Sequence, residues 1–329
     1  MKKKEHKLTF LMAAHNEEKL IANALNRLAE VYNDYNNIEV IIGMDGCTDR
    51  TPEIVAGFVK KYKFFRAFEL NERSGKQAVL EKLEPYITGD IIVIHDADWT
   101  FVYRSKQDLL DYMKMFDDKK IGGVSESVDS EMTRSDFLKI KSMGFLASAW
   151  GNHLILLYLK KNFTRKKKGF QNVYVYAPKK IKFYPLLDVY KKEVMDLTEH
   201  KRGLKAGDHV ERSLRIINAG YEIAGFNNNN WPHFLDNYNA QSIKDLINQK
   251  VRGIIAKSKL QSSYNFNIPF FGFYLPFLLF LIKNSFRAKR WIDFFAVHTF
   301  IFVMFYSHIL AKIKQKLSQK DVWALRVKR

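Results

Sequence analysis

One short segment of the chain constrains its fold more than any other. Four β-branched residues, Ile91 to Ile94, follow a Gly89-Asp90 turn and lead directly to Asp96 and Asp98. Such a run is typical of a strand that is buried on both faces, as in a parallel α/β sheet. Because alternate strand residues point the same way, we expect Asp96 and Asp98 to face one site at a sheet edge. An Asp-rich solvated turn is the alternative interpretation.

The charges of these two aspartates suggest what the site would hold. Two like charges at one point repel each other unless a cation lies between them. Carboxylate oxygens suit a hard divalent cation, which can itself hold a phosphate group. The segment therefore predicts a metal site for a phosphorylated ligand.

The first 125 residues alternate between strand and helix patterns. Strands are expected at 8–14, 39–44, 64–70, 91–94 and 121–125. Helices are expected at 17–32, with Asn16 as N-cap, at 76–84, and from Thr51 and Ser105 onward. Further helices are expected at 188–197, 208–218 and 242–260. This order predicts an α/β fold with a doubly wound, mostly parallel sheet flanked by helices.

Charge and cysteine content narrow the class of protein. The net charge is +19, which suits an anionic membrane surface, phosphorylated substrates or nucleic acid. The single cysteine, Cys47, excludes an intramolecular disulfide and fits a reducing, cytoplasmic setting. The charged start of the chain does not resemble a signal peptide. Basic and aromatic residues do not interleave as in nucleic-acid modules, so we expect no nucleic-acid partner.

Two apolar segments near the C-terminus predict membrane association. Residues 264–282 carry no formal charge, and residues 291–311 carry only Asp293 and two histidines. Each approaches the length that crosses a bilayer, and four cations lie between them. Because Pro269 and Pro276 interrupt the first segment, a re-entrant hairpin or interfacial helices are alternatives to two spanning helices.

Small and polar residues follow the first two predicted strands. Ala14, Asn16 and Glu17 follow the first, and Asp45 and Gly46 follow the second. A carboxylate there can accept a hydrogen bond from the ring N–H of a nucleotide base. Capping of the next helix is the competing explanation for Asn16.

The third predicted strand is followed by Arg73, Gly75 and Lys76, which offer two cations on a flexible backbone. This is not a phosphate-binding P-loop, because Leu70 stands in place of its first glycine and Gln77 in place of its Ser or Thr.

Three further candidates lie downstream. Asp208 begins a predicted helix, where N-capping is the alternative role. Gln249 and Arg252 are three residues apart and share a helix face, from which the arginine can bind a diphosphate bidentately. His233 lies among aromatic residues, where it either completes a metal site or is simply packed.

In their order and spacing these residues resemble glycosyltransferase family 2, over residues 7 to 260. The markers are Asn16-Glu17, Asp45-Gly46, Gly75-Lys76, Asp96 and Asp98, Tyr190 to Glu193, Gly207-Asp208, Gly220-Tyr221, and Gln249 with Arg252. The resemblance implies a GT-A fold and an inverting sugar transfer from a nucleotide sugar. It also implies a divalent cation, Mn²⁺ or Mg²⁺.

The resemblance assigns a role to each candidate. Asp208 would be the catalytic base. Gln249 and Arg252 would hold the diphosphate or the acceptor, and Asp98 with Asp96 would bind the metal, with His233 as a further candidate. The nucleotide would be bound by Ala14, Asn16, Glu17, Asp45, Gly75, Lys76 and Asp96.

Three positions depart from the family pattern. Met44 precedes Asp45 and Gly207 precedes Asp208, whereas the family usually has an acid at both places. Gly253 stands where processive synthases carry tryptophan, and only two apolar segments follow it. We therefore expect a single transfer rather than polymerisation.

The predicted protein is a membrane-associated glycosyltransferase. We expect a catalytic domain at 1–260, facing the cytoplasm, and membrane-associated helices at 261–329. The donor is expected to be a UDP-sugar rather than a GDP-sugar, and the acceptor lipid-linked, polyprenyl-type or membrane-proximal. A processive polysaccharide synthase is the nearest alternative. A basic, non-enzymatic binder of membrane or nucleic acid is an alternative of another class.

Overall fold

The computed structural model describes residues 5–125, 142–170, 173–177, 187–198, 208–226, 232–236, 242–264 and 267–317. The chain forms two compact units. The sheet unit comprises Met1–Val128, Lys166–Val175 and Pro185–Asn237, and the helical unit comprises Asp129–Arg165, Tyr176–Tyr184 and Tyr238–Arg329. Two helices that begin before residue 260 thus group with the C-terminal helices. The domain limits expected from the sequence stay a prediction.

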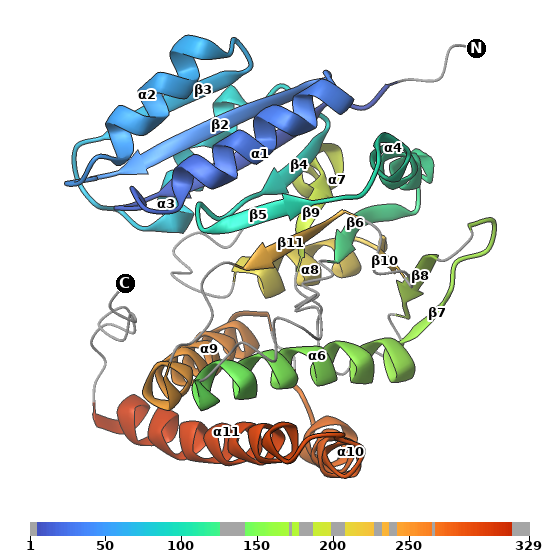
Figure 1. Ribbon diagram of the computed structural model, residues 1–329. Helices are drawn as coiled ribbons and strands as arrows, with labels where there is room; N and C mark the ends of the chain where they lie inside the picture. The colour runs from blue at the N-terminus through green and yellow to red at the C-terminus, as the bar shows by residue number, and fades with distance from the viewer. Residues whose placement is uncertain are drawn as a thin grey trace. The chain divides into compact units, whose positions relative to one another are not determined.

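The sheet unit alternates strands and helices as its sequence predicts (Figure 1). Its strands are β1 (Leu8–Ala14), β2 (Ile38–Asp45), β3 (Phe65–Leu70), β4 (Ile91–Ile94), β5 (Trp99–Val102), β6 (Ile121–Ser125), β8 (Val173–Tyr176), β9 (Leu187–Lys191), β10 (Glu222–Phe226) and β11 (His233–Asp236). Its helices are α1 (Ile21–Asp34), α2 (Thr51–Lys61), α3 (Lys76–Leu83), α4 (Lys106–Lys114), α7 (Lys192–Asp196) and α8 (Asp208–Asn218). The short strand β7 (Thr164–Lys166) joins the edge of the sheet.

The main sheet is mixed, with the order β3-β2-β1-β4-β9-β6-β10-β8-β7. Strands β3, β2, β1 and β4 are parallel, so their carboxyl ends share one edge. Strand β9 runs antiparallel to both β4 and β6, and β10 is parallel to β6 but antiparallel to β8. Strands β5 and β11 form a separate antiparallel pair. This is the α/β sheet with flanking helices that the sequence predicts.

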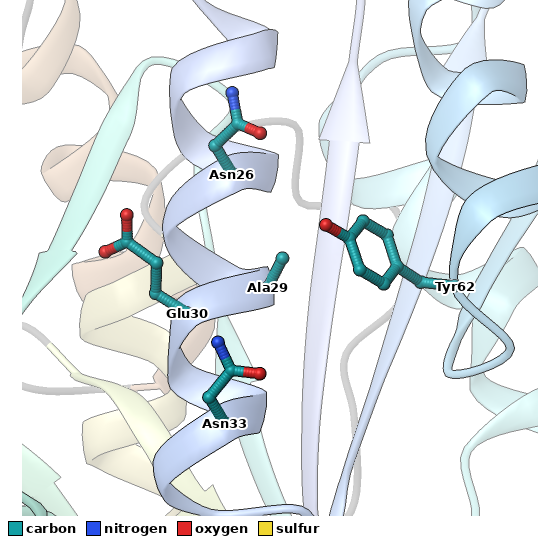
Figure 2. Close-up of a pocket in the computed structure, with 5 residues that line it drawn as sticks. All are labelled: Asn26, Ala29, Glu30, Asn33 and Tyr62. Carbon is teal, nitrogen blue, oxygen red and sulfur yellow. The ribbon is translucent and has the colours of Figure 1, made fainter.

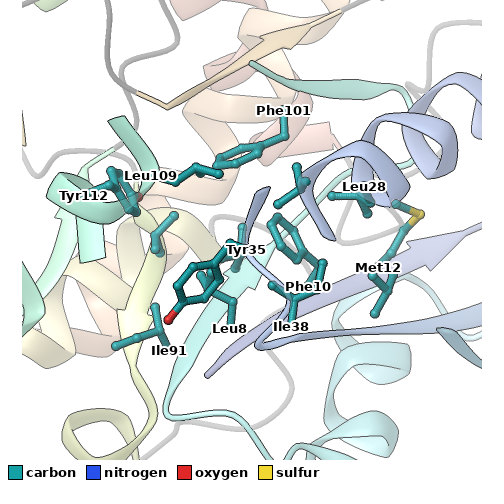
Figure 3. Close-up of a cluster of buried hydrophobic side chains, with 14 of the residues drawn as sticks. Leu8, Phe10, Met12, Leu28, Tyr35, Ile38, Ile91, Phe101, Leu109 and Tyr112 are labelled. Carbon is teal, nitrogen blue, oxygen red and sulfur yellow. The ribbon is translucent and has the colours of Figure 1, made fainter. Parts of the chain in front are cut away.

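A hydrophobic core lies between this sheet and α1 (Figure 3). Phe10 and Met12 alternate on β1 and are fully buried, as are Leu25 and Leu28 on the inner face of α1. Phe10 also packs edge-on against Phe101 of β5, with ring centroids 5.4 Å apart. The burial of these side chains fixes the register of the strands and so aligns their carboxyl ends.

Two sequence expectations for this unit are wrong. Helix α1 begins at Ile21 rather than Glu17, and Asn16 is not its cap: Asn16 adopts a left-handed conformation (φ 55°), and its side chain accepts a hydrogen bond from the N–H of Thr48. The expected helix at 188–197 is instead the strand β9 followed by the short helix α7. Strand β9 is buried on both faces, so its sequence lacks the period of two that distinguishes a strand from a helix.

The helical unit contains α6 (Met143–Phe163), α9 (Ile243–Tyr264), a π-helical turn (Phe270–Tyr274), α10 (Leu275–Ser285) and α11 (Trp291–Leu317). Small residues on α6 let its neighbours approach closely. A Cβ atom on Gly151 would lie 2.1 Å from the ring of Phe300, and one on Gly144 would lie 2.3 Å from the backbone of Ser242. Among the described residues, one helix, Trp291–Lys316, is long and apolar enough to span a membrane, while the apolar stretch Phe270–Ser285 is shorter.

Candidate active site

The carboxylate of Asp45 organises the loop after β3. It accepts hydrogen bonds from the backbone N–H of Ser74 at 2.6 Å, from the Ser74 hydroxyl at 3.0 Å and from the Gly75 N–H at 2.8 Å. Gly75 has a φ of +92°, a backbone conformation that residues other than glycine rarely adopt. It directly precedes the first residue of α3. Asp45 therefore fixes the place where α3 begins, which is Lys76.

Lys76 lies between two of the predicted acidic residues. Its ammonium is 2.6 Å from Asp96 and 3.8 Å from Asp208. These three residues come from the start of α3, the loop after β4 and the start of α8, which are far apart in sequence. Burial disfavours the ammonium, but Asp96 and Asp208 hold the pKa of Lys76 above its usual range.

The Asp96 to Asp98 segment is a turn and not the continuation of a strand. Strand β4 ends at Ile94, and the N–H of Trp99 donates to the carbonyl of Asp96 at 3.0 Å. The expectation that strand alternation makes the two carboxylates point the same way is therefore wrong, because neither aspartate lies in a strand. Asp98 is 7% exposed, and His95 donates from Nδ1 to the Asp96 carbonyl at 2.8 Å. Burial lowers the pKa of His95 to about 4, which keeps its ring neutral in this role.

A buried ionic network surrounds Asp208. Arg212, one turn along α8, donates to Asp208 at 3.0 Å, to the carbonyl of Leu187 at 2.7 Å and to the carboxylate of Asp188. His209 Nδ1 is 2.6 Å from Asp188, and its Nε2 is 3.8 Å from Asp208. The ring of Trp99 is stacked beside His209 with centroids 6.4 Å apart. Each acid in the network thus has a cationic partner.

These contacts set the protonation of the site. Burial alone would raise the pKa of Asp208, but His209, Lys76 and Arg212 hold it well below its usual range. Burial likewise opposes ionisation of Asp188, and its pKa is nevertheless lowered by His209 and Arg212. In turn, Asp188 and Asp208 raise the pKa of His209 against the effect of burial. Asp208 is therefore a carboxylate at neutral pH.

Two sets of side chains are candidates for a divalent cation. Asp188, Asp208 and His209 offer ligand atoms that all lie within 4.8 Å of one another. Arg212 already hydrogen-bonds both aspartates of that set and supplies its positive charge. Asp96 contacts the ammonium of Lys76 at 2.6 Å. Metal binding by Asp96 and Asp98 stays a prediction.

Side-chain hydrogen bonds connect the segment after β1 to the end of β2 and the loop that follows it. The carbonyl oxygen of Asp45 accepts a hydrogen bond from His15 Nδ1 at 2.6 Å, and Asn16 Oδ1 accepts one from the N–H of Thr48 at 2.8 Å. The N–H of Glu17 donates to the Thr51 hydroxyl at 2.8 Å. Ala14 is buried at the end of β1. Ala14, Asn16 and Glu17 therefore shape the sheet edge, and nucleotide binding by them stays a prediction.

Three other predicted residues are not brought to this cluster by the described contacts. Gln249 and Arg252 lie on α9 in the helical unit, and His233 begins β11. Their expected roles toward diphosphate and metal remain predictions.

A surface hollow elsewhere in the sheet unit includes none of the predicted site residues. It is lined by Asn26, Ala29, Glu30 and Asn33 of α1 and by Tyr62, which follows α2. Figure 2 shows the Tyr62 ring directed toward α1. The hollow offers one carboxylate and neutral groups, so it does not suit an anionic ligand.

Sequence reasoning missed Asp188, His209 and Arg212. Two signals were present. Arg212 follows Asp208 by four residues, which places both on one helix face. Asp188 stands between apolar residues in Leu187-Asp188-Val189, and a charge at a buried strand position requires a partner.

Comparison with known proteins identifies the family of this chain. Residues 9–178 match the family described as Glycosyl transferase family 2. Probable glycosyltransferase YdaM of Bacillus subtilis is 34% identical over 97 residues, which are 29% of this chain and 23% of that protein. The β-monoglucosyldiacylglycerol synthase of Nostoc sp. is 31% identical over 119 residues, 36% of this chain and 25% of that one. The chain thus spans about a quarter of the length of these relatives.

Two solved structures share the fold. Mannosyltransferase PcManGT from Pyrobaculum calidifontis, in complex with GDP-Man and Mn²⁺, has a TM-score of 0.52 at 16% identity, over 98% of this chain and 79% of that one. Residues 1–349 of TarS from S. aureus give a TM-score of 0.50 at 13% identity, over 95% and 76%. The family match covers more than half of the chain, and these structures agree with its fold. The chain belongs to glycosyltransferase family 2 and has the GT-A fold.

Proposed function

We propose that the chain is an inverting, metal-dependent glycosyltransferase that moves one sugar from a nucleotide donor to a lipid-linked or membrane-proximal acceptor. One observation carries the proposal. Lys76 lies between Asp96 and Asp208 at the edge where parallel strands end, in a chain that belongs to family 2. Such an edge is where open α/β sheets bind nucleotides.

Lys76 is the residue that we expect to respond to the donor. The diphosphate of a nucleotide sugar attracts the ammonium that now binds Asp96. Asp96 and Asp98 then offer their oxygens to Mn²⁺ or Mg²⁺, with His233 as a further candidate ligand. When bound, the cation supplies Lewis-acid stabilisation of the leaving diphosphate.

Asp208 is the proposed catalytic base. Movement of Lys76 toward the diphosphate removes one of the cations that hold the pKa of Asp208 low, so donor binding makes this carboxylate a stronger base. It can then accept the proton of an acceptor hydroxyl that attacks C1 of the sugar. An acceptor that is already ionised, such as a polyprenyl phosphate, would not need this base.

The remaining candidates bind the substrates in this proposal. Ala14, Asn16, Glu17 and Asp45 contact the nucleoside, with Gly75 at the turn that presents Lys76. Gln249 and Arg252 approach the diphosphate or the acceptor.

The acceptor and the location follow from two observations. The Nostoc relative is named for a glucosylated diacylglycerol, which supports a lipid acceptor. Helix α11 is apolar and long enough to meet a membrane, which supports membrane association. That the catalytic unit faces the cytoplasm is part of the proposal and rests on the single cysteine of the chain. We propose a UDP-sugar as donor, with a GDP-sugar as the alternative.

Calorimetric titration of the detergent-purified protein tests this function. UDP and GDP are each added with and without Mn²⁺, to the native chain, to Lys76→Met and to Asp98→Ala. Metal-dependent binding of one nucleotide is expected, at least tenfold weaker in both variants. Lys114→Met, which removes an exposed lysine of α4, serves as the control. Folded protein that binds neither nucleotide would refute the proposal.

Product length distinguishes single transfer from polymerisation. With a short primer and excess donor, mass spectrometry should detect addition of one sugar. A ladder of products would instead support a processive synthase.

A further inference from the structure

Helix α11 turns its large apolar side chains outward. Trp291, Phe302 and Ile309 are 80%, 62% and 57% exposed, and Phe295, Phe305 and Ile313 are exposed as well. These six residues recur at intervals of three, four or seven, which places them on one side of the helix. We call them the α11 apolar face. Over the whole of Trp291–Ala311, which the structure describes, this face carries no formal charge.

The opposite side of α11 holds the polar groups. Asp293 is 5% exposed and accepts hydrogen bonds from Arg290 at 2.6 Å and 2.8 Å and from the Trp150 ring N–H at 3.1 Å. Ser307 is fully buried, and its hydroxyl donates to the carbonyl of Ile247 at 3.4 Å. A helix on the surface of a water-soluble unit has the reverse pattern. The apolar face of α11 therefore requires a non-aqueous neighbour.

The exposed apolar surface is concentrated in one region. Of seventeen exposed large hydrophobic residues in the described chain, thirteen lie between Phe270 and Ile313. Leu279 on α10 and Phe286 in the link after it are also exposed. Surface of this extent marks an interaction site and not scattered exposure.

Helix α9 excludes a simple membrane-spanning arrangement of α11. Helices α6 and α9 both pack against α11 and lie on one side of it (Figure 1). Six of the 22 residues of α9 are charged. Lys250 of α9 lies over the ring of Phe300, 5.3 Å from its centroid, close to the middle of α11. If α11 crossed a bilayer, α9 would bring these charges to the level of the hydrocarbon.

Cations flank the apolar face at both of its ends. Lys283, Arg287 and Lys289 precede α11 and are exposed, and Lys312 and Lys316 are exposed near its C-terminus. Spanning would place the two groups on opposite sides of the membrane. A helix that lies flat brings both groups to one layer of anionic headgroups.

We propose that α11, with α10, lies in the plane of the membrane as an interfacial platform whose apolar face enters an anionic lipid surface without crossing it. This inference specifies the membrane association in the proposed function and rests on it. The occupant of the face is the bilayer, because cations rim an apolar surface on a helix whose other side is already packed.

Depth measurements on the full-length chain test the platform. Cys47→Ser provides a cysteine-free background, into which Phe295→Cys, Phe302→Cys and Ile309→Cys are introduced one at a time for nitroxide labelling. The labels are measured on vesicles of phosphatidylglycerol and phosphatidylcholine. An in-plane helix gives three equal, shallow depths. A spanning helix would place residue 302 deeper than the other two by about 10 Å, seven residues at 1.5 Å each, and would overturn the proposal.

Vesicle binding gives a second readout. Phe302→Glu with Phe305→Glu should weaken binding at least tenfold, because two charges enter the apolar face. Leu197→Glu, which changes a 74% exposed leucine of the sheet unit, is the matched control and should bind normally. Binding should also weaken on pure phosphatidylcholine. Equal binding by the double variant would overturn the proposal.

Nucleotide titration of the same preparations separates this inference from the proposed function. Lost vesicle binding with normal nucleotide affinity in the double variant supports the platform. If the native chain binds vesicles with equal label depths but binds no nucleotide, the platform is supported and the donor site is refuted. If the chain without detergent is a dimer that does not bind vesicles, a second copy covers the α11 apolar face and the platform is overturned.

Discussion

The sheet unit buries a cluster of ions of both signs, whereas the helical unit also holds a cation over an aromatic ring. In the sheet unit Asp188 and Asp208 are matched by Arg212 and His209, so ions of both signs are buried together. In the helical unit the ammonium of Lys250 rests over an aromatic ring, and burial lowers its pKa to about 8. The same unit exposes apolar rings on α11.

The difference indicates a different neighbour for each surface. In the proposed function a charged ligand rearranges the ion pairs near Lys76, because its phosphates can replace Asp96 and Asp208 as partners of the ammonium. The α11 apolar face has no such chemistry and gains only by leaving water. Four predictions follow from this contrast, from the largest effect to the smallest.

Replacement of Asp208 with asparagine tests whether the sheet unit's charges are catalytic. The variant keeps the shape of the side chain but removes its capacity to accept a proton. We expect kcat to fall by about 10²- to 10⁴-fold, measured as sugar transfer to a hydroxyl acceptor. Asp196→Asn, which removes an exposed carboxylate paired with Lys192, is the control. Near-normal turnover would mean that another group is the base or that the acceptor is already ionised.

Arg212→Met tests how strongly the buried network depends on pairing. It leaves Asp188, which is fully buried, without one of its cations, and we expect a loss of about 3–5 kcal/mol in the free energy of unfolding. Arg50→Met breaks an exposed pair with Glu53 and should cost far less, because water already screens both charges. The measurement is denaturant unfolding. Equal losses in both variants would remove the contrast between buried and surface pairs.

Asp293→Asn tests the inward polar side of α11. The change weakens the charged hydrogen bonds from Arg290 and the bond from Trp150 in a buried place. We expect a loss of about 1–3 kcal/mol in unfolding of the helical unit. Ser307→Ala is the comparison, because its hydroxyl makes one long hydrogen bond. An Asp293 variant as stable as the native chain would show that α11 is held by its apolar contacts alone.

Lys250 should have the smallest effect, a change in how stability depends on pH, and the direction of that change tests its lowered pKa. Its pKa in the folded chain is about 8, against about 10.4 in an unfolded chain. Between these values the unfolded state binds more protons, so stability should rise as pH rises from 8 to 10. Lys250→Met should reduce this rise by about 1 kcal/mol or less, since the side chain is only partly buried. Lys259→Met, on an exposed part of α9, should leave it unchanged.

Much of the fold was predictable from local pattern. The strands at Leu8–Ala14 and Ile91–Ile94 are continuous apolar runs, and the helix at Asp208–Asn218 begins and ends where its sequence predicts. Helix α4 also begins where its sequence predicts, because Ser105 is its N-cap and forms a capping box with Asp108. The pattern failed at β9, where burial on both faces hides the period of two.

The candidate site was predictable only in part. Asp45, Lys76, Asp96 and Asp208 were identified by their places at strand and helix ends. The role of Asp45 in holding the loop before α3 was not predictable. It depends on hydrogen bonds to Ser74 and Gly75, which lie 29 and 30 positions further along the chain.

By itself, the sequence determined the alternation of strands and helices, the family and the apolar C-terminal segments, because these depend on side-chain pattern along short stretches. Only the tertiary structure decided that Lys76 lies between Asp96 and Asp208, that Asp188 joins Arg212 and His209, and that the rings of α11 face outward. These are contacts between segments distant in the chain. The free energy of pairing a buried charge depends on which segments meet, and no local pattern contains that information.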